Sequence, residues 1–274
     1  MSIELNDEQL KHLQHVELEL LQEFDRICRK HGIKYTITGG TLLGAVRHSG
    51  FIPWDDDADI SMLRSEYAKF VTVCDSEIDG NKFYFQDINR TEGYRWGYGK
   101  LRRKDSLFLR ENQEHMPYEQ GIFIDIFPRD GVPDAPVLER IHYFKCFVIR
   151  KMLWSEVGRF AEKCLYKRII YSILHLIPLK WIRVAYRDLV KSSNRYETKR
   201  VRALTFPIPH KGKGYLRKWY DTYEDILFEG YPLMVEQGYR EWLAYEFHDY
   251  MQLPPINKRK KHSVVKIKFP EEVV

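Results

Sequence analysis

Four aspartates occur between positions 55 and 59, and two of them, Asp57 and Asp59, are separated by a single small residue. In a strand these two side chains point to one face while Ala58 and Ile60 point to the other, because side chains alternate along extended backbone. Two carboxylates on one face repel each other unless a cation lies between them, and their oxygen atoms are ligands that suit Mg²⁺ or Mn²⁺. The pattern therefore predicts a strand over residues 57–62 that holds a divalent metal ion.

Two other structures also place several acids together. A solvent-exposed loop is the commonest, but Trp54 on one side and Ile60 on the other favour partial burial of this segment. A calcium-binding EF-hand loop would carry acids at the observed spacing, yet it requires glycine at its sixth position for a sharp turn, and Ile60 stands there. The sequence excludes the calcium loop and favours a half-buried strand.

A pair of glycines, Gly39-Gly40, separates a β-prone run at residues 34–38 from a short helix predicted over residues 41–47. Backbone without a Cβ atom can approach a phosphate closely, and the first turn of a helix offers unpaired N–H groups and the positive end of its dipole. We therefore expect Gly39, Gly40 and Thr41 to bind a phosphate group next to the metal. A phosphate cradle followed by paired acids is a stronger signal than either motif alone.

A third acid stands in the clearest buried strand of the chain, Gly121 to Pro128, whose only charged residue is Asp125. An ionised carboxylate inside such a strand is costly unless a metal ion or hydrogen bonds compensate it. Asp125 is thus predicted to complete the metal site or to take the proton from the attacking group. A hydrogen-bonded structural aspartate is the alternative.

The candidates for the rest of a substrate site are less specific. The cations that we expect to contact donor phosphates are Arg47, Lys100 and Arg102. The aromatic side chains that could stack on a base or hold a cationic headgroup by cation–π contact are Trp54, Trp96 and Tyr98. Surface exposure of the cations and core packing of the aromatic rings are the alternatives.

The elements that must position these residues follow from the periodicity of the chain. Apolar residues recur at helical spacing over residues 6–31, with Asn6 and Gln9 forming a capping-box start. Residues 82–110 alternate as strands and turns do, whereas residues 137–200 are helical and rich in basic residues. The chain is predicted to be α+β, a small mixed sheet flanked by helices with a helical insertion. We place the divisions at residues 1–136 for the catalytic core, 137–202 for the insertion and 203–274 for a C-terminal segment that packs back on the core.

Composition narrows the class of protein. The 274 residues carry 44 Lys and Arg against 39 Asp and Glu, spread along the chain, which favours anionic substrates over a dedicated nucleic-acid surface. The four cysteines form no CxxC pair and are expected to be reduced thiols. The N-terminus lacks the features of a secretory signal, and the most apolar stretch, residues 169–179, is shorter than the ~20 residues needed to span a bilayer. We therefore expect a cytoplasmic protein.

One segment of the insertion predicts peripheral contact with the inner face of a membrane. Residues 166–187 place isoleucine and leucine side chains among lysine and arginine. A helix with an apolar face and basic flanks can lie on an anionic bilayer, which would bring the site to a lipid-linked acceptor. An ordinary helix packed on the core is the alternative.

Residues 39–60 resemble the signature of the LicD family, whose members transfer phosphocholine and related groups from CDP-linked donors to glycans; the fukutin-related ribitol-phosphate transferases belong to the same wider group. The residues that match the family pattern are Gly39 and Gly40 for its glycine turn, Asp57 and Asp59 for its metal pair, and Asp125 for its third acid. The family resembles the nucleotidyltransferase fold. The closing segment of the chain is also similar, although His262 is followed by Ser263 where family members often have paired histidines.

The resemblance implies metal-dependent transfer of a phospho-alcohol group, with phosphocholine from CDP-choline as the favoured cargo. The implied acceptor is a hydroxyl of a cell-surface glycan, such as lipopolysaccharide or teichoic acid, or of its lipid-linked precursor. Mg²⁺ or Mn²⁺ is the implied cofactor, and no nucleic acid is an expected partner. A nucleotidyltransferase that releases pyrophosphate uses the same metal geometry, and it remains an alternative, as does a non-catalytic nucleotide-binding protein.

Overall fold

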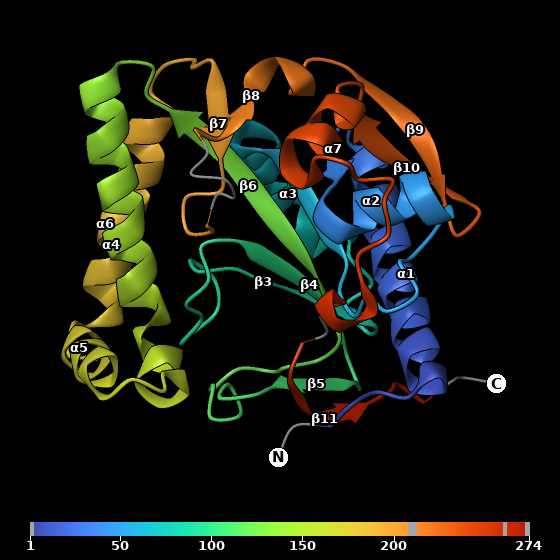
Figure 1. The fold of residues 1–274 in the computed structure, drawn as a ribbon, viewed down its shortest axis with the longest axis horizontal. Coiled ribbons are helices and arrows are strands. Elements are labelled where there is room, and N and C mark those ends of the chain that lie inside the picture. The colour runs from blue at the N-terminus through green and yellow to red at the C-terminus, as the bar shows by residue number, and fades with distance from the viewer. Residues whose placement is uncertain (1–2, 208–212, 260–261, 272–274) are drawn as a thin grey trace.

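The computed structural model describes residues 3–207, 213–259 and 262–271. Its centre is a seven-stranded mixed sheet in the order β1-β2-β6-β4-β3, with β7 beside β6 and β8 beside β7 (Figure 1). The strands are β1 (Thr36–Ile37), β2 (Asp59–Leu63), β3 (Phe83–Gln86), β4 (Gly99–Arg103), β6 (Phe123–Val132), β7 (Arg200–Arg202) and β8 (Tyr215–Leu216). The long strand β6 pairs parallel to β2 on one side and antiparallel to β4 on the other. This mixed sheet with its helices confirms the predicted α+β class.

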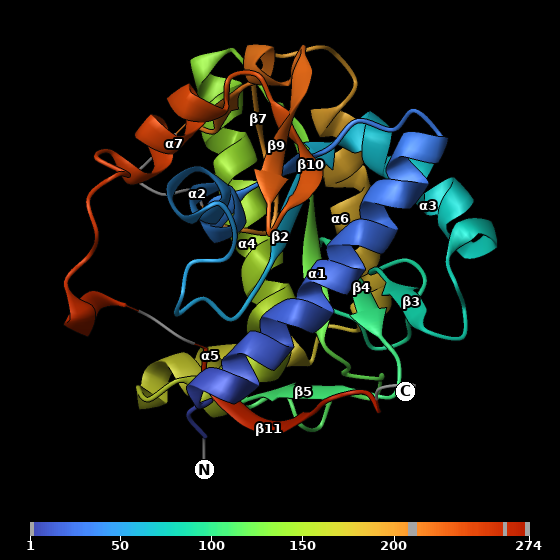
Figure 2. The same ribbon diagram turned by 90° about the vertical axis from the view of Figure 1, so that its right-hand side faces the viewer.

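The opening helix α1 (Asp7–Lys30) lies across the sheet (Figure 2). Its N-terminus has the predicted capping box, because the Asn6 side chain accepts a hydrogen bond from Gln9 N at 2.8 Å and Gln9 Oε1 accepts one from Asn6 N at 3.1 Å. The apolar stripe from Leu10 to Phe24 is buried in the main core. Capping and burial together fix α1 against β4 and β6, the strands that carry part of the candidate site.

The segment from β1 to β2 differs from the prediction at two boundaries. The helix α2 (Gly39–His48) begins at the glycines themselves, so the pair forms its first turn instead of a turn before it. Strand β2 begins at Asp59, two residues later than predicted, so Asp57 precedes the strand. The reason is the left-handed φ of 61° at Gly39, which turns the chain into α2 after only two residues of β1. Residues before Asp59 therefore have no β1 partner, and α3 (Arg64–Glu77) follows β2 directly.

A helical insertion stands at one side of the sheet (Figure 1), formed by α4 (Pro136–Ala161), α5 (Leu165–His175) and α6 (Leu179–Ser193). Buried apolar residues of α4 and α6 form a second core cluster together with residues of the segments next to the sheet, including Tyr94, Trp96 and Leu204. Taken one at a time, none of the helices in the described ranges has the length and apolar character to cross a bilayer. The helices α5 and α6 meet that threshold only as a pair, with a bend of 89° between them.

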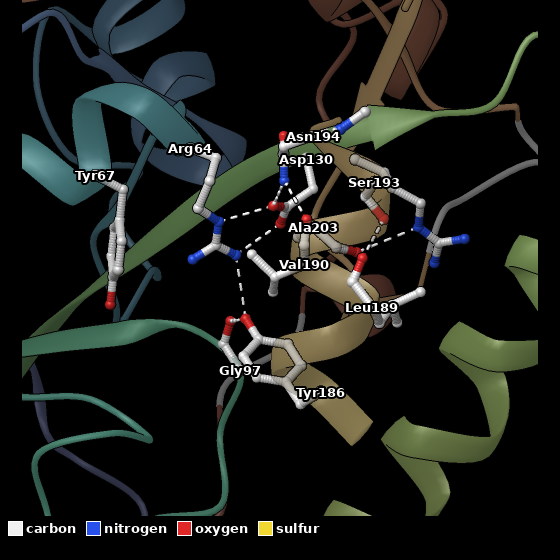
Figure 3. A network of polar contacts seen from close by, with 12 residues as sticks. Arg64, Tyr67, Gly97, Asp130, Tyr186, Leu189, Val190, Ser193, Asn194 and Ala203 are labelled. Carbon is white, nitrogen blue, oxygen red and sulfur yellow. Dashed lines mark hydrogen bonds and ion pairs between the residues drawn. The ribbon is translucent and has the colours of Figure 1, made fainter. Parts of the chain in front are cut away.

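Hydrogen bonds around a buried ion pair between α3 and β6 tie α6 to the central strand (Figure 3). Arg64, the first residue of α3, donates from Nε and Nη2 to the two oxygens of Asp130 on β6, at 2.7 and 2.6 Å. The Tyr186 hydroxyl on α6 accepts from Arg64 Nη2 at 3.1 Å and donates to Gly97 O at 2.7 Å, while Asn194 Nδ2 donates to Asp130 Oδ1 at 2.6 Å. A bidentate arginine–carboxylate pair has a fixed geometry, so this network orients the insertion relative to the sheet.

The C-terminal segment returns to the N-terminal core. After β8, its elements are η2 (Arg217–Tyr220), β9 (Tyr223–Phe228), β10 (Tyr231–Glu236), α7 (Tyr239–Phe247), η3 (Ile256–Lys258) and β11 (Val264–Lys268). Strand β11 pairs with β5 (Leu107–Arg110). Glu236 on β10 is buried and hydrogen-bonds with Thr36 of β1. The divisions at residues 136 and 202 stay a prediction, and β7, which lies inside the predicted insertion, is a strand of the central sheet.

Candidate metal and donor site

Asp59 and Asp125 lie side by side on adjacent strands. They are paired in register between β2 and β6, and Asp125 is paired in turn with Lys100 of β4. Residues in register on neighbouring strands point to the same face, so the three side chains form a row across the sheet. Lys100 Nζ contacts Asp125 Oδ1, and both of these side chains are buried. The fold thus joins two of the predicted acids to one of the predicted cations.

The N-terminus of α2 lies against this row. A Cβ atom on Gly39 would lie 3.0 Å from Asp59 Oδ2, and one on Gly40 would collide with Asp55 Oδ2. Thr41 Oγ1 accepts a hydrogen bond from Asp59 N at 2.8 Å. The glycines therefore make room for carboxylates at the positive end of a helix dipole, where negative charge is stabilised, and Thr41 fixes the backbone of Asp59.

Asp56 and Asp57 contact the C-terminal segment through His262. The His262 N–H donates to Asp56 Oδ2 at 2.8 Å, and its ring Nδ1 lies 2.9 Å from Asp56 Oδ1 and 3.6 Å from Asp57 Oδ2. Within the described ranges, these three residues form a group whose potential ligand atoms all lie within 4.8 Å of one another. His262 contacts both oxygens of Asp56, and we infer that this contact holds the C-terminal segment beside Asp57.

The acids of this site raise one another's proton affinity. Burial, followed by repulsion from Asp57, raises the pKa of Asp55 to about 8. Burial and the same neighbour hold the pKa of Asp59 well above its ordinary value. Burial also raises the pKa of Asp57, although the nearby His262 opposes the shift. Carboxylates that disfavour each other's ionisation fit a divalent cation, because its charge would let them ionise together.

Two further cationic side chains, Arg102 and Arg110, lie near the row of Asp59, Asp125 and Lys100. Lys100 and Arg102 stand two residues apart on β4 and so share a face. Arg102 is committed to structural partners, because its Nε and Nη1 donate, both at 2.6 Å, to the Gln86 side chain and to a backbone carbonyl. Arg110, at the end of β5, lies 3.8 Å from Asp57 Oδ2, and its buried Nε and Nη2 have no hydrogen-bond partner among the described residues. Arg110 is therefore the cation best placed to receive an anionic ligand.

A cavity of about 340 Å³ opens beside these cations. Its charged and ionisable lining includes Lys100, Arg102, Arg110 and His262, and its aromatic lining includes Trp96, Tyr98, Phe123, Trp154 and Phe206. The ring of Trp96 lies 5.6 Å from that of Trp154 and 6.4 Å from that of Tyr98. A cationic side suits a phosphate group, and an aromatic wall suits a base or a cationic headgroup joined to it.

Two residues expected at the site make other contacts. Arg47 stands in the last turn of α2, roughly 12 Å along the helix from Gly39 at ~1.5 Å per residue. Its Nη1 donates to Tyr250 O at 3.0 Å, so Arg47 holds the C-terminal segment. Trp54 does not line the cavity and lies under Arg259, whose guanidinium carbon is 4.0 Å from the ring centre. Arg47 is only seven residues from Gly40 in the sequence, but it lies at the opposite end of α2 from the glycines and the acids.

Two residues of the site were not predicted, Glu17 and Arg110. Glu17 on α1 is buried, its Oε2 has no hydrogen-bond partner within the described ranges, and burial, followed by repulsion from Asp57, holds its pKa well above the ordinary value. A signal existed for it, since Glu17 interrupts the apolar stripe between Leu13 and Leu20 where a leucine would fit. Arg110 carried no such signal, because β5 reaches the acids only through the fold.

Comparisons with known proteins agree with the predicted resemblance. Residues 32–144 match the family model described as LicD/FKTN/FKRP, nucleotidyltransferase domain. Over 267 residues the chain is 31% identical to the lipopolysaccharide cholinephosphotransferase LicD of Haemophilus influenzae, an alignment that covers 93% of this chain and 96% of that protein. Shorter matches reach uncharacterized proteins of Rickettsia prowazekii, 29% identical over 42% of this chain and 40% of that protein, and of Rickettsia typhi, 44% identical over 20% and 18%. The chain therefore belongs to the LicD family.

Proposed function

We propose that this enzyme transfers phosphocholine from CDP-choline to a hydroxyl group of lipopolysaccharide or a related cell-surface glycan. The chain is a LicD-type transferase. The observation that carries the choice of substrate is its 31% identity to a protein named as a lipopolysaccharide cholinephosphotransferase, over 93% of this chain. The row of Asp59, Asp125 and Lys100 beside a cavity with cationic and aromatic walls supports a diphosphate donor with a cationic headgroup.

We assign a Mg²⁺ or Mn²⁺ ion to Asp57, Asp59 and Asp125. The support is chemical: these are hard oxygen ligands, and the pKa values of Asp57 and Asp59 are raised by burial, as expected of carboxylates that need a cation. One oxygen of Asp125 contacts Lys100, which leaves the other for the ion. When bound, the ion would stabilise the negative charge that develops on the leaving CMP.

The donor diphosphate would lie between the cations and the first turn of α2. Arg110 supplies guanidinium N–H groups that have no hydrogen-bond partner within the described ranges, and the backbone N–H groups at Gly39 and Gly40 supply the positive end of a helix. Arg102 lines the cavity, but its guanidinium donates to Gln86 Oε1 and Gly121 O, so we assign it no contact with the phosphates. The cytosine or the choline group would contact the aromatic wall, which includes Trp96.

In the transfer step, the acceptor hydroxyl oxygen forms a bond to the phosphorus of the phosphocholine group while the bond from that phosphorus to the CMP oxygen breaks. The hydroxyl proton must leave as this bond forms. Asp125 can accept it or serve as a metal ligand. Lys100, whose pKa is lowered to about 7 by burial, contacts Asp125 Oδ1 and so orients this carboxylate.

A donor panel tests this proposal. The purified enzyme is incubated with CDP-choline, CDP-ribitol or CDP-glycerol, a glycan acceptor, and either Mg²⁺, Mn²⁺ or EDTA, and CMP is measured. We expect acceptor-dependent CMP release that is greatest with CDP-choline, stops in EDTA and returns with metal. Release from CDP-ribitol alone would keep the mechanism and reject the choline assignment. Absence of CMP with every donor would reject the proposal.

A nucleotidyltransferase reaction is the second candidate, because the matching family model is described as a nucleotidyltransferase domain. It would use the same acids but attack the phosphorus next to the nucleoside and release pyrophosphate from a nucleoside triphosphate. Incubation with CTP and a phospho-alcohol separates the two reactions, since only the second candidate yields pyrophosphate.

A further inference from the structure

The outer side of α5 is apolar where the outer side of a helix in a soluble protein is ordinarily polar. The exposed apolar residues of α5 and its C-cap are Leu165, Tyr166, Ile169, Ile170, Ile173 and Leu176, which we call the α5 face. Their exposed fractions lie between 49% at Ile170 and 77% at Leu176. At ~100° per residue, this spacing puts all of them on one side of the helix, so the face is continuous.

Packing on α4 fixes this orientation. Tyr171, on the opposite side of α5, is 4% exposed and lies on Gly158, where a Cβ atom would come within 2.7 Å of the tyrosine ring. The Tyr171 hydroxyl accepts a hydrogen bond from Lys151 Nζ at 2.7 Å, and His175 Nδ1 lies 3.1 Å from Glu156 Oε2. Rotating α5 to bury its apolar face would break these contacts, so the face belongs to the folded surface.

The surroundings of the α5 face are basic. Residues 137–202 hold sixteen Lys and Arg against five Asp and Glu, which leaves 28 against 34 in the rest of the chain. The exposed cations on and next to α5 and α6 are Lys163, Lys167, Arg168, Lys180, Arg187 and Lys191. An anionic lipid surface matches this pattern, because apolar side chains enter the boundary of the acyl chains while cations contact the headgroups.

We propose that the α5 face docks on the surface of an anionic lipid bilayer. In this arrangement α5 lies in the plane of the interface, and Trp181 at the start of α6, which is 60% exposed, lies at headgroup level. Docking also brings the candidate site to the lipid, because Trp154 and Ala161 of α4 line the donor cavity and α5 begins at Leu165. Docking is a property separate from the proposed transfer reaction, and it would bring a lipid-linked acceptor to the site.

Vesicle co-sedimentation of the full chain tests the docking. The vesicles contain phosphatidylcholine alone or phosphatidylcholine mixed with phosphatidylglycerol, at low and at high salt. We expect binding to the anionic vesicles to be at least about tenfold stronger than to the zwitterionic ones, and weaker at high salt. No binding to the anionic vesicles at low salt would overturn the proposal.

A matched pair of variants locates the contact. Ile169→Glu/Ile173→Glu should lower binding to anionic vesicles at least about tenfold, because it places two charges in the apolar face. Leu227→Glu, at a leucine on β9 that is 61% exposed, should bind as the unchanged protein does. Circular dichroism and thermal melting check that both fold, which is expected because all three positions are exposed. Equal binding by the two variants would reject the α5 face as the contact.

A second copy of the chain is the competing occupant, and sedimentation without lipid distinguishes it. If the protein is a dimer that Ile173→Glu separates, and vesicle binding is unchanged in that variant, the face is a protein interface and the docking proposal is wrong. Vesicle binding is measured without a donor, so its outcome is independent of the transfer reaction. With a water-soluble glycan acceptor, Ile169→Glu/Ile173→Glu should release CMP at the rate of the unchanged enzyme.

Discussion

The central sheet and the helical insertion depart from ordinary burial in opposite directions. The sheet region buries charge, since Glu17, Lys100 and Asp125 are 2%, 4% and 5% exposed, whereas the insertion exposes apolar side chains such as Ile173 and Leu176, at 60% and 77%. Buried charge is costly without a partner, and large exposed apolar patches mark interaction sites. Each departure has a partner in our proposals: a cation and a donor diphosphate for the sheet region, and a lipid surface for the insertion.

The two regions also treat carboxylates differently. In the sheet region, burial and then repulsion from Asp57 raise the pKa of Asp55 to about 8. In the insertion, burial alone would raise the pKa of Glu156, but the hydrogen bond from Arg159 and the charge of Arg95 outweigh it and lower that pKa. Asp55 thus lies among other acids, whereas Glu156 lies among cations.

The largest expected effect is the loss of turnover and metal binding when a carboxylate of the row is neutralised. Asp59→Asn and Asp125→Asn should each lower CMP release at least about 100-fold, since even the outer-shell partners of metal ligands contribute roughly 10–100-fold. Isothermal titration with Mn²⁺ should show weakened binding in the same variants. Glu224→Gln, at an exposed acid on β9, is the control and should leave both unchanged. Near-normal turnover in Asp59→Asn would contradict the assigned metal site.

The next effect is on the pH dependence of stability, which we expect to have opposite signs for Glu236 and Glu156. Burial raises the pKa of Glu236 to about 7 from 4.5. The folded state therefore holds a proton that the unfolded state releases, and stability falls as pH rises from about 4.5 to 7. Glu236→Gln should remove this loss, on the order of 2–3 kcal/mol at neutral pH by the linkage of ~1.4 kcal/mol per pKa unit.

Glu156 should show the reverse behaviour. Its lowered pKa means that its contribution to stability is present above the ordinary value of 4.5 and is lost as pH falls through the lower folded value. Glu156→Gln should therefore be less stable than the unchanged protein at neutral pH and approach it in acid. Urea unfolding between about pH 3 and 8 measures the free energy of unfolding of both variants relative to the unchanged protein. The same pH dependence of this difference for the two variants would contradict the prediction.

A smaller effect is expected from removing the guanidinium of Arg110, whose Nε and Nη2 have no hydrogen-bond partner among the described residues. Arg110→Gln should raise the KM for the donor about tenfold, which is the loss of one charge-assisted contact of ~1.4 kcal/mol to a phosphate. Arg47→Gln is the matched control, because Arg47 bonds to Tyr250 O and should affect melting temperature instead of KM. The assignment of Arg110 fails if Arg47→Gln weakens donor binding while Arg110→Gln does not.

The smallest effect concerns Glu17. Glu17→Leu restores the apolar stripe of α1 and removes a buried carboxylate, so it should raise the free energy of unfolding by about 1 kcal/mol without metal, as hydrophobic replacement of buried ionic groups often does. Lys11→Leu, on the exposed side of the same helix, should change it by less than about 0.5 kcal/mol. Denaturant unfolding in EDTA measures the free energy of unfolding of both variants. A lower value for Glu17→Leu would contradict the prediction, because it would show that the buried carboxylate makes a stabilising contact.

Several features of the fold followed from short-range patterns. The capping box at Asn6 and the apolar stripe behind it specify α1, because both depend on residues one or two turns apart. The glycine pair and the paired acids pointed to the family for the same reason. Boundaries were less accurate: Asp57 falls outside β2 because the positive φ at Gly39 shortens β1, a constraint that alternation along one strand does not contain.

The sequence alone identifies an α+β member of the LicD family with an acid-rich segment at residues 55–59 and a basic helical insertion. The register of Asp59, Asp125 and Lys100 is known only from the fold, since strand pairing joins segments distant in the chain. The fold also shows that the apolar side of α5 faces outward, because Tyr171 packs on Gly158. Periodicity specifies that a helix has an apolar face, whereas packing against its neighbours specifies where that face points.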